Sequence, residues 1–313
     1  MREKKRRIPI GWRLAHGQRC LLAVWLVVLT GCLWLMWHEM GVPWSWLGAA
    51  VLLGGHASAL ALELCCARLV QGADAAPRPT WRGLGRAWWV ELRWSLRVFV
   101  WQQPFVWRRH PDPTETVRGA RAVVLVHGFL CNRGFWLPWL ERLSARQLPY
   151  ATVSLEPVFG GIDAYVAQVE EAVSRAEGLT GMAPVLVGHS MGGLAIRAWM
   201  AATPDAPLRV AHVVTIGTPH RGTWLARWSR AVNGRQMREG SRWLRALEQR
   251  ERDQRPVGTY AGFTCWRSNA DNVVFPPANA TLPDADDRQL SDVPHVGLAF
   301  EPAVLEDVLA RLR

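Results

Sequence analysis

Cysteine is scarce in this sequence, and none of it stands at a metal-binding spacing. The 313 residues include six cysteines and no C-x-x-C pair, so the sequence predicts neither a zinc site nor a dithiol redox centre. We therefore expect no metal, no cofactor, and thiols that are buried or lipid-facing. The cysteines in or beside apolar runs are Cys20, Cys32, Cys65 and Cys66. A disulfide between the other two, Cys131 and Cys265, would require an oxidising compartment.

A basic field around a catalytic region is also lacking, although the net charge is +11. Residues 1–110 hold 15 basic and 5 acidic residues, whereas residues 111–313 hold 22 and 21. A nucleic-acid enzyme would carry its positive charge around its working site. Here the excess lies beside long apolar runs, which favours attraction to lipid headgroups and argues against nucleic acid as a partner.

Two apolar runs near the N-terminus contain no acidic or basic residue apart from one histidine. Cys20–Trp37 is 18 residues long, and Trp44–Leu62 is 19 residues long with His56 inside it. At about 1.5 Å per residue, each run is just long enough to cross a bilayer core of about 30 Å. No A-x-A cleavage site follows the first run, which disfavours a cleavable signal peptide. We expect a basic segment at 1–19 and a transmembrane hairpin within 20–66.

The flanking charges predict the orientation of this hairpin. Lysine and arginine lie outside both runs, and the short connection between the runs has neither. The positive-inside rule then places both ends, and the catalytic part that follows, in the cytoplasm. If only the first run spans the membrane, the catalytic part lies on the opposite side.

Residues 67–116 combine a linker with a basic amphipathic segment. In Trp81–His110, four arginines share one helical stripe, and apolar residues cluster on another face. This pattern predicts either a helix in the membrane interface or one whose apolar face packs on the globular domain. Pro104 and Pro111 are predicted to end it. The arginines are Arg82, Arg86, Arg93 and Arg97, and the apolar cluster is Trp81, Trp88, Leu92, Leu96 and Phe99.

From residue 117 onwards, apolar runs alternate with helical segments. The strand-like runs include RAVVLVHGF, YATVSLEP, PVLVG and RVAHVVTIGTP, and the segments between them have helical character. Strands that are apolar on both faces are typical of a parallel sheet covered by helices on both sides. The sequence therefore predicts an α/β catalytic domain over residues 117–313.

One serine lies between two glycine steps at the end of such a strand. Gly188-His189-Ser190-Met191-Gly192 forms a G-x-S-x-G motif between PVLV and a helical segment. A serine nucleophile projects from a turn too tight for side chains two residues away, and the following helix adds its positive N-terminal end. Ser190 is the candidate nucleophile. The alternative is a glycine-rich turn with an incidental serine.

The acid and the base are expected after the serine, in the order Asp then His. Asp271 follows a strand-like run, and His295 precedes a final helix at Glu301–Arg313. His295 is predicted to be the general base and Asp271 the residue that orients its ring. Other candidates for the acid lie in a polar loop: Asp284, Asp286, Asp287 and Asp292.

The oxyanion is expected to bind to two backbone amides. His127-Gly128-Phe129 ends the first predicted strand, where the oxyanion loop of such hydrolases lies. The N–H groups of Phe129 and Met191 are the predicted donors. His127 is expected to be structural, and His189 to point away from the nucleophile beside it.

Three stretches resemble bacterial lipases of the α/β-hydrolase superfamily, the group that contains the secreted triacylglycerol lipases of proteobacteria. They are LVHGF, the span from GHSMGGLAIRAW to TIGTPHRGT, and SNADNVVFP with HVGL. The resemblance covers about residues 120–310 and implies an α/β-hydrolase fold, carboxylic ester hydrolysis and a helical lid at about 221–256. The family's catalytic and oxyanion positions fall on Ser190, Asp271, His295, Phe129 and Met191.

Two departures from these lipases limit the comparison. The secreted enzymes have no membrane hairpin, and their calcium site has no matching motif here, so neither export nor calcium is carried over. The anchor indicates a membrane-bound subgroup, which we place in the bacterial inner membrane as a multi-pass protein. The lid segment carries ten arginines and three tryptophans. It would suit an anionic lipid surface or an ordinary solvated cap.

Together these features predict a membrane-anchored serine hydrolase that cleaves lipid or acyl esters through an acyl-enzyme. An acyltransferase, a thioesterase or a deacylase of lipid-linked glycans would use the same triad. A non-catalytic membrane adaptor with a hydrolase fold is the alternative from another class. The partners expected are the ester substrate and membrane lipids, and the sequence does not predict an oligomeric state.

Overall fold

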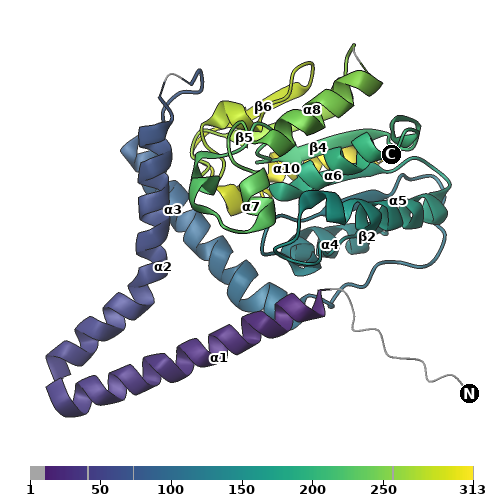
Figure 1. Cartoon of the computed structure of the whole chain (residues 1–313). Coiled ribbons are helices and arrows are strands. Elements are labelled where there is room, and N and C mark those ends of the chain that lie inside the picture. Colours follow the sequence, from purple (N-terminus) through teal and green to yellow (C-terminus); the bar gives the residue numbers. More distant parts are fainter. Residues whose placement is uncertain (1–10, 41, 73, 256, 313) are drawn as a thin grey trace, which may run out of the picture.

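A computed structural model describes residues 11–40, 42–72, 74–255 and 257–312 (Figure 1). A six-stranded parallel sheet lies at its centre, with strand order β2-β1-β3-β4-β5-β6. The α/β prediction is therefore confirmed. The strands are β1 (Val123–Val126), β2 (Tyr150–Thr152), β3 (Val185–His189), β4 (His212–Ile216), β5 (Phe263–Ser268) and β6 (Asp286–Leu290).

Helices cover both faces of this sheet because alternate strand residues point to opposite sides. In β1, Val124 and Val126 join one core with α5 (Val166–Thr180) and α6 (Met191–Ala202). Val123 and Leu125 join the other. That second core contains α4 (Leu137–Ala145), α9 (His295–Leu298) and α10 (Pro302–Ala310). Short 3₁₀ turns complete the layers: η3 (Arg133–Trp136), η4 (Ile162–Tyr165), η5 (Ala206–Leu208) and η7 (Pro277–Ala280).

The edge strand β6 lies in the stretch that the sequence analysis assigned to a polar loop. Its sequence is DDRQL, and none of its residues is buried. A strand at the edge of a sheet forms its ladder with one neighbour only, and its sides face water. The apolar pattern that identified the other strands is therefore missing from β6.

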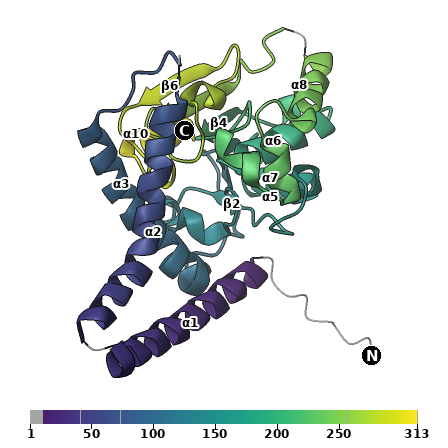
Figure 2. The same ribbon diagram turned by 60° about the vertical axis from the view of Figure 1, so that its left-hand side comes forward.

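The N-terminal helices form an open V beside the α/β core. Helix α1 (Trp12–Leu35) continues as η1 (Met36–Met40), and α2 (Val42–Val70) returns towards the core. Both views show α1 and α2 meeting at a corner far from the sheet, with α2 rising alongside α3 (Trp81–Ser95) (Figures 1 and 2). Helix α3 in turn contacts α9.

One helix in the described part of the chain, Trp12–His38, is long and apolar enough by length and composition to cross a membrane. It contains the first predicted span. The second, 44–62, lies on α2, where several side chains fall outside the described residues. The last turns of α2 bury Leu60, Leu64 and Ala67 in the molecule. Of the predicted basic segment 1–19, residues 1–10 lie outside the description.

One expectation for the amphipathic segment is wrong. Pro104 does not end the helix, which continues from α3 as a π-helix, η2 (Leu96–Val106). In π-type bonding the N–H groups reach back five residues, so the wider turn accommodates a proline that an α-helix would exclude. Of the predicted apolar cluster, Trp81 and Leu96 are exposed, whereas Trp88 and Phe99 are partly buried against the core, so the structure leaves room for both predicted roles. The buried residues of this segment include Leu84, Ala87, Glu91, Ser95 and Val98.

The predicted lid segment is helical and docked on the core. It contains η6 (Trp224–Trp228), α7 (Val232–Gln236) and α8 (Arg242–Gln254). Helix α8 packs on α6, and Leu244 and Leu247 are buried beneath it. The Glu251 carboxylate binds the buried Arg197 guanidinium at 2.6 Å.

Candidate active site

Ser190 occupies a strained turn between β3 and α6. Its φ is 54° and its ψ is −127°, a backbone conformation that residues with a side chain rarely adopt. The residues two positions before and after Ser190 must be glycine, because neighbouring backbone atoms leave no room there for a side chain. A methyl group on Gly188 would lie 2.5 Å from the amide nitrogen of Gly193, and one on Gly192 would lie 2.3 Å from the carbonyl oxygen of Val126. This is the geometry that lifts a nucleophile above a sheet.

The loop that carries Phe129, the predicted oxyanion loop, lies directly against this turn. A methyl group on Gly128 would lie 2.8 Å from Ser190 Cβ, so the residue before Phe129 contacts the candidate nucleophile. Met191 is the first residue of α6, and its N–H belongs to the positive end of the helix. Neither the Phe129 nor the Met191 amide donates to a protein acceptor within the described residues. An unoccupied donor is what the prediction requires of both amides.

Asp271 and His295 form a buried pair near the carboxyl ends of the strands, on the side of the sheet where Ser190 lies. His295 Nδ1 lies 2.9 Å from Asp271 Oδ2, and the two side chains are 5% and 3% exposed. The other carboxylate oxygen, Oδ1, accepts from the amides of Val273 at 2.8 Å and Val274 at 2.7 Å. Nδ1–H therefore donates to a fixed carboxylate, which leaves Nε2 as the ring nitrogen free to accept a proton.

The electrostatics of this pair favour the charged form of the histidine. Burial by itself lowers the pKa of His295, but the charge and hydrogen bond of Asp271 raise it above the ordinary histidine value. The more distant charges of Glu91 and Glu63 act in the same direction. An imidazolium formed during proton transfer would be stabilised at this position.

The candidate nucleophile and the pair meet around the end of β4. The Ser190 amide donates to the Ile216 carbonyl at 2.8 Å. A methyl group on the next residue, Gly217, would lie 3.0 Å from Asp271 Oδ2 and 3.1 Å from His295 Nδ1. The structure describes no hydrogen bond between Ser190 Oγ and His295. Catalytic hydrogen bonds are often long in free enzymes and shorten when substrate binds.

Three other histidines are buried and act as structural groups. Leu155 N–H donates to His127 Nε2 at 3.1 Å, so Nδ1 carries the proton that is shared with the Gly128 carbonyl. His189 stacks on Phe135 and bonds the His295 carbonyl at 3.1 Å through Nε2. Burial lowers the pKa of His127 to about 4 and that of His189 well below its ordinary value. His220 bonds the Thr215 hydroxyl at 3.0 Å.

The other aspartates considered for the acid lie elsewhere. Asp287 binds Arg267 at 2.8 Å, and Asp286 binds Arg288 at 2.8 Å, both on or beside β6. Asp292 lies against α3, because a methyl group on Gly83 would meet its carboxylate. Asp284 is exposed in the turn before β6.

Sequence reasoning missed two polar groups beside His295, one on helix α3 and one in the loop that follows Asp271. Glu91 on α3 accepts hydrogen bonds from the amides of Val296 and Gly297, and Asn272 accepts one from the amide of His295. A local signal for Glu91 existed. It is the only acidic residue in 81–110 and lies on the helical face of Leu84, Ala87, Ser95 and Val98.

The two cysteines of the catalytic half are unpaired and buried. Burial raises the pKa of Cys131 to about 12 and that of Cys265 to about 11, so both are inert thiols. Within the described residues no group of three or more histidine, cysteine, aspartate or glutamate side chains is arranged to hold a metal ion.

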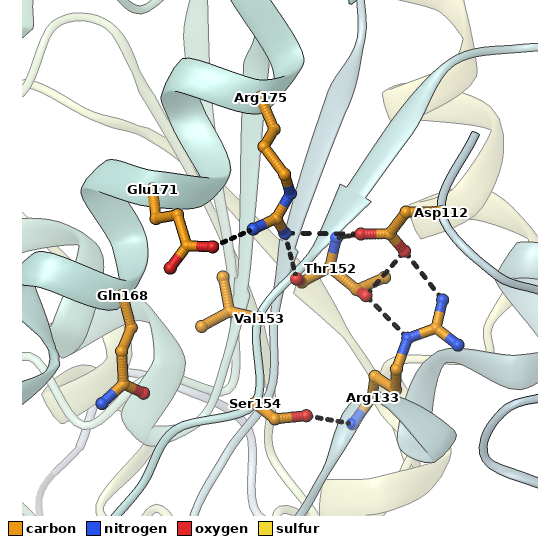
Figure 3. A pocket seen from close by; sticks show the side chains of 8 residues that line it. All are labelled: Asp112, Arg133, Thr152, Val153, Ser154, Gln168, Glu171 and Arg175. Carbon is orange, nitrogen blue, oxygen red and sulfur yellow. Dashed lines mark hydrogen bonds and ion pairs between the residues drawn. The ribbon is translucent and has the colours of Figure 1, made fainter. Parts of the chain in front are cut away.

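A polar cavity of about 180 Å³ lies beside β2 and is lined by none of the candidate catalytic residues (Figure 3). Asp112 lies between two arginines, 2.7 Å from Arg133 and 3.4 Å from Arg175. It also accepts from the Thr152 amide and hydroxyl. These groups satisfy one another, so the cluster fastens the segment before β1 to the sheet edge.

Comparison with known proteins supports the fold and the family. Residues 123–311 match the Alpha/beta hydrolase family, which is more than half of the chain. Lipase B of Aspergillus fumigatus is 18% identical with a TM-score of 0.54, covering 62% of this chain and 53% of that one. Mature lipase BlEst2 of Bacillus licheniformis is 20% identical with a TM-score of 0.51, covering 64% and 94%.

The chain thus spans about half the length of the Aspergillus enzyme, and these likenesses show a shared fold. A search of curated proteins finds no match. The narrower resemblance to proteobacterial lipases stays a prediction. The matched family region contains the G-x-S-x-G turn, the sheet and the Asp–His pair described above. We conclude that this chain belongs to the α/β-hydrolase family.

Proposed function

We propose that the protein is a membrane-anchored serine hydrolase that cleaves carboxylic esters through an acyl-enzyme on Ser190. One observation carries this proposal. The strained Ser190 follows strand β3, and its amide bonds the Ile216 carbonyl. The next residue, Gly217, adjoins the buried pair of Asp271 and His295, whose side chains are joined at 2.9 Å. A structural serine would not need this backbone strain, and a structural histidine would not need a buried carboxylate.

The reaction follows from these positions. Ser190 Oγ attacks the ester carbonyl carbon while His295 Nε2 takes the hydroxyl proton, and Asp271 stabilises the imidazolium. The carbonyl oxygen becomes an oxyanion that binds the amides of Phe129 and Met191. When the C–O bond breaks, His295 returns the proton to the leaving alcohol. Water then attacks the acyl-enzyme by the same steps and releases the acid and free Ser190.

Exposed apolar side chains on the surrounding loops favour an acyl or lipid substrate. Leu130 and Phe159 are 40% and 59% exposed, and Phe159 contacts Phe129 edge-on at 5.8 Å. Trp228 and Val232 are exposed on the lid segment. Such a rim would contact an acyl chain before it reaches the nucleophile. The lid role of 221–256 is part of this proposal.

The membrane anchor is the second part of the proposal. Trp12–His38 would supply one span, and the uncharged run 44–62 on α2 supports a second, in the multi-pass arrangement described above. Exposed Trp89, Trp101 and Phe105 on α3 and η2 adjoin the exposed arginines of the same helices. Aromatic and basic side chains together are typical of a helix at a lipid surface. Water-soluble monomers rarely expose this much aromatic surface.

Labelling of the detergent-solubilised full chain with a fluorophosphonate tests the catalytic part. We expect the wild type and a Ser174→Ala control to be labelled and Ser190→Ala not to be, because Ser174 is an exposed serine outside the site. On acyl esters of graded length, Ser190→Ala should lose at least about 10⁴-fold in kcat. Released acid and transferred acyl product are both measured, since an acyltransferase uses the same intermediate. A wild type without labelling would favour the non-catalytic adaptor.

A further inference from the structure

Helix α3 places one carboxylate directly beneath the residues that follow His295. Glu91 Oε2 accepts from the Val296 amide at 3.0 Å and from the Gly297 amide at 3.3 Å, and Oε1 lies 3.2 Å from the Val296 amide. Glu91 is 1% exposed. Its contacts are therefore with the backbone that carries the candidate base, across more than 200 residues of sequence.

This carboxylate is buried without a cationic partner from its own helix. Helix α3 and its continuation η2 carry four arginines, yet the ion pairs in the described part of the chain include none with Glu91. Burying an unpaired carboxylate is costly, and such groups persist mainly where they serve a site. Burial raises the pKa of Glu91 to about 7, and the neighbouring His295 partly opposes this shift.

A second connection reaches His295 from α2. The His295 amide donates to Asn272 Oδ1 at 3.1 Å, and Asn272 Nδ2 donates to Glu63 Oε2 at 2.8 Å. Three successive amides are therefore connected to the N-terminal helices. Those of Val296 and Gly297 donate to Glu91 on α3, and that of His295 is linked through Asn272 to Glu63 on α2. Asn272 also follows Asp271 directly, so both members of the candidate pair are linked to the N-terminal helices.

The oxyanion side has a corresponding contact from η2. Gln103 Oε1 accepts from the Asn132 amide at 3.0 Å, and the Gln103 carbonyl accepts from Asn132 Nδ2 at 3.2 Å. Gln103 and Asn132 are fully buried. The loop that begins at Phe129 is thus held by the same N-terminal segment.

We propose that Glu91 is a positioning residue for catalysis, which fixes the imidazole of His295 through the Val296 and Gly297 amides and through its negative charge. The N-terminal helices then complete the active site in addition to attaching it to a membrane. This inference rests on the proposed function, because it assigns His295 the role of base. The charged and titratable groups that face the imidazole are Asp271, Glu91, Glu63 and the neutral His189.

The test is the pH profile of kcat/KM for the detergent-solubilised full chain. Glu91→Gln removes the charge, so the pKa of His295 falls and the acid limb of the profile moves to lower pH. Glutamine also points an N–H towards an amide donor, and we expect kcat/KM to fall about tenfold, mainly in kcat. Glu91→Asp retains the charge, so its acid limb should stay near the wild-type position even though its rate falls.

Two further variants keep the test decisive. Glu115→Gln is the matched control, because Glu115 is exposed and remote from His295, and we expect it to leave the profile unchanged. Glu63→Gln still offers an oxygen to Asn272 and should move the acid limb in the same direction by less, which provides the readout if Glu91→Gln does not fold.

The outcomes separate this inference from the proposed function. An active wild type together with an unshifted acid limb in both Glu91→Gln and Glu63→Gln overturns the role of the N-terminal carboxylates. Equal loss of rate in Glu91→Gln and Glu91→Asp, without any shift, also overturns it, because it indicates packing alone. A wild type without Ser190-dependent turnover overturns the proposed function itself.

Discussion

At the scale of single residues, the candidate site depends on backbone that tolerates only small side chains. Ser190 has a positive φ, and the turn around it closes because Gly188 and Gly192 have no Cβ. Space for a methyl group at Gly192 is taken by the carbonyl oxygens of Val126 and His127, at 2.3 and 2.7 Å. These are backbone atoms of a central strand and the loop after it, so they cannot move aside separately.

Gly192→Ala is predicted to damage both stability and activity. Overpacking a rigid site costs about 1–3 kcal/mol, and the shift needed would displace the Phe129 and Met191 amides. Gly178→Ala is the control, because no atom lies within 4 Å of the added methyl group on α5, and alanine favours a helix by about 0.5–1 kcal/mol. Thermal unfolding and fluorophosphonate labelling measure the two effects. A fully labelled and stable Gly192→Ala would contradict the close packing.

The positions of the candidate site residues could be predicted because each has a local signature. Ser190 lies in a strand–turn–helix motif, and Asp271 and His295 follow or precede recognisable elements in the expected order. The sequence marks Glu91 as a lone acid on the buried face of its helix, but the partners of Glu91 and Glu63 could not be assigned in this way. Their contacts with the backbone at 296 and with Asn272 join parts of the chain about 200 residues apart, and no local pattern encodes such a pairing.

At the scale of elements, a strand can be predicted from the sequence when both of its faces are buried, because nearly all of its residues are then apolar. Strands β1 and β3 are wholly buried, and their unbroken apolar runs predicted them. Strand β6 is polar and open to water, and η2 passes through a proline, so both depart from the patterns that identify regular elements. Their existence depends on the neighbouring strand β5 and on the core surface that η2 packs against.

Helix α8 offers a prediction at this scale. Its Glu251 neutralises the fully buried Arg197 of α6, and the Tyr260 hydroxyl donates to the same carboxylate at 2.7 Å. Glu251→Ala leaves Arg197 charged and unpaired, and we expect a loss of about 3–5 kcal/mol in the free energy of unfolding. Glu248→Ala, which breaks a surface pair with Arg252 on the same helix, should change it by less than about 1 kcal/mol. Denaturant unfolding distinguishes them, and equal effects would contradict the prediction.

At the scale of the whole molecule, two regions of different chemistry share one set of contacts. Residues 1–110 carry +10 of the net charge of +11, and residues 111–313 are close to neutral. Yet α2, α3 and η2 reach Asn272, Val296 and Asn132 in the core. The N-terminal helices and the α/β domain therefore fold against each other.

The orientation in the membrane is a prediction at this scale. Basic residues outside both apolar runs place both ends of the chain on the cytoplasmic side. A C-terminal fusion should therefore be active with a cytoplasmic reporter and inactive with a periplasmic one, in cells expressing the full chain. The reverse result would mean that only Trp12–His38 crosses the membrane and that α2 stays with the catalytic domain.

The linkage of Glu91 to the backbone after His295 has a consequence for proteolysis. The only connection between η2 and β1 is the stretch 107–122. A protease that cut there, followed by loss of the leading fragment, would strip the carboxylate from beneath the base. Under the proposal made above for Glu91, a fragment released by such a cut would work at a lower rate than the full chain, so cleavage there would weaken the proposed activity instead of setting it free.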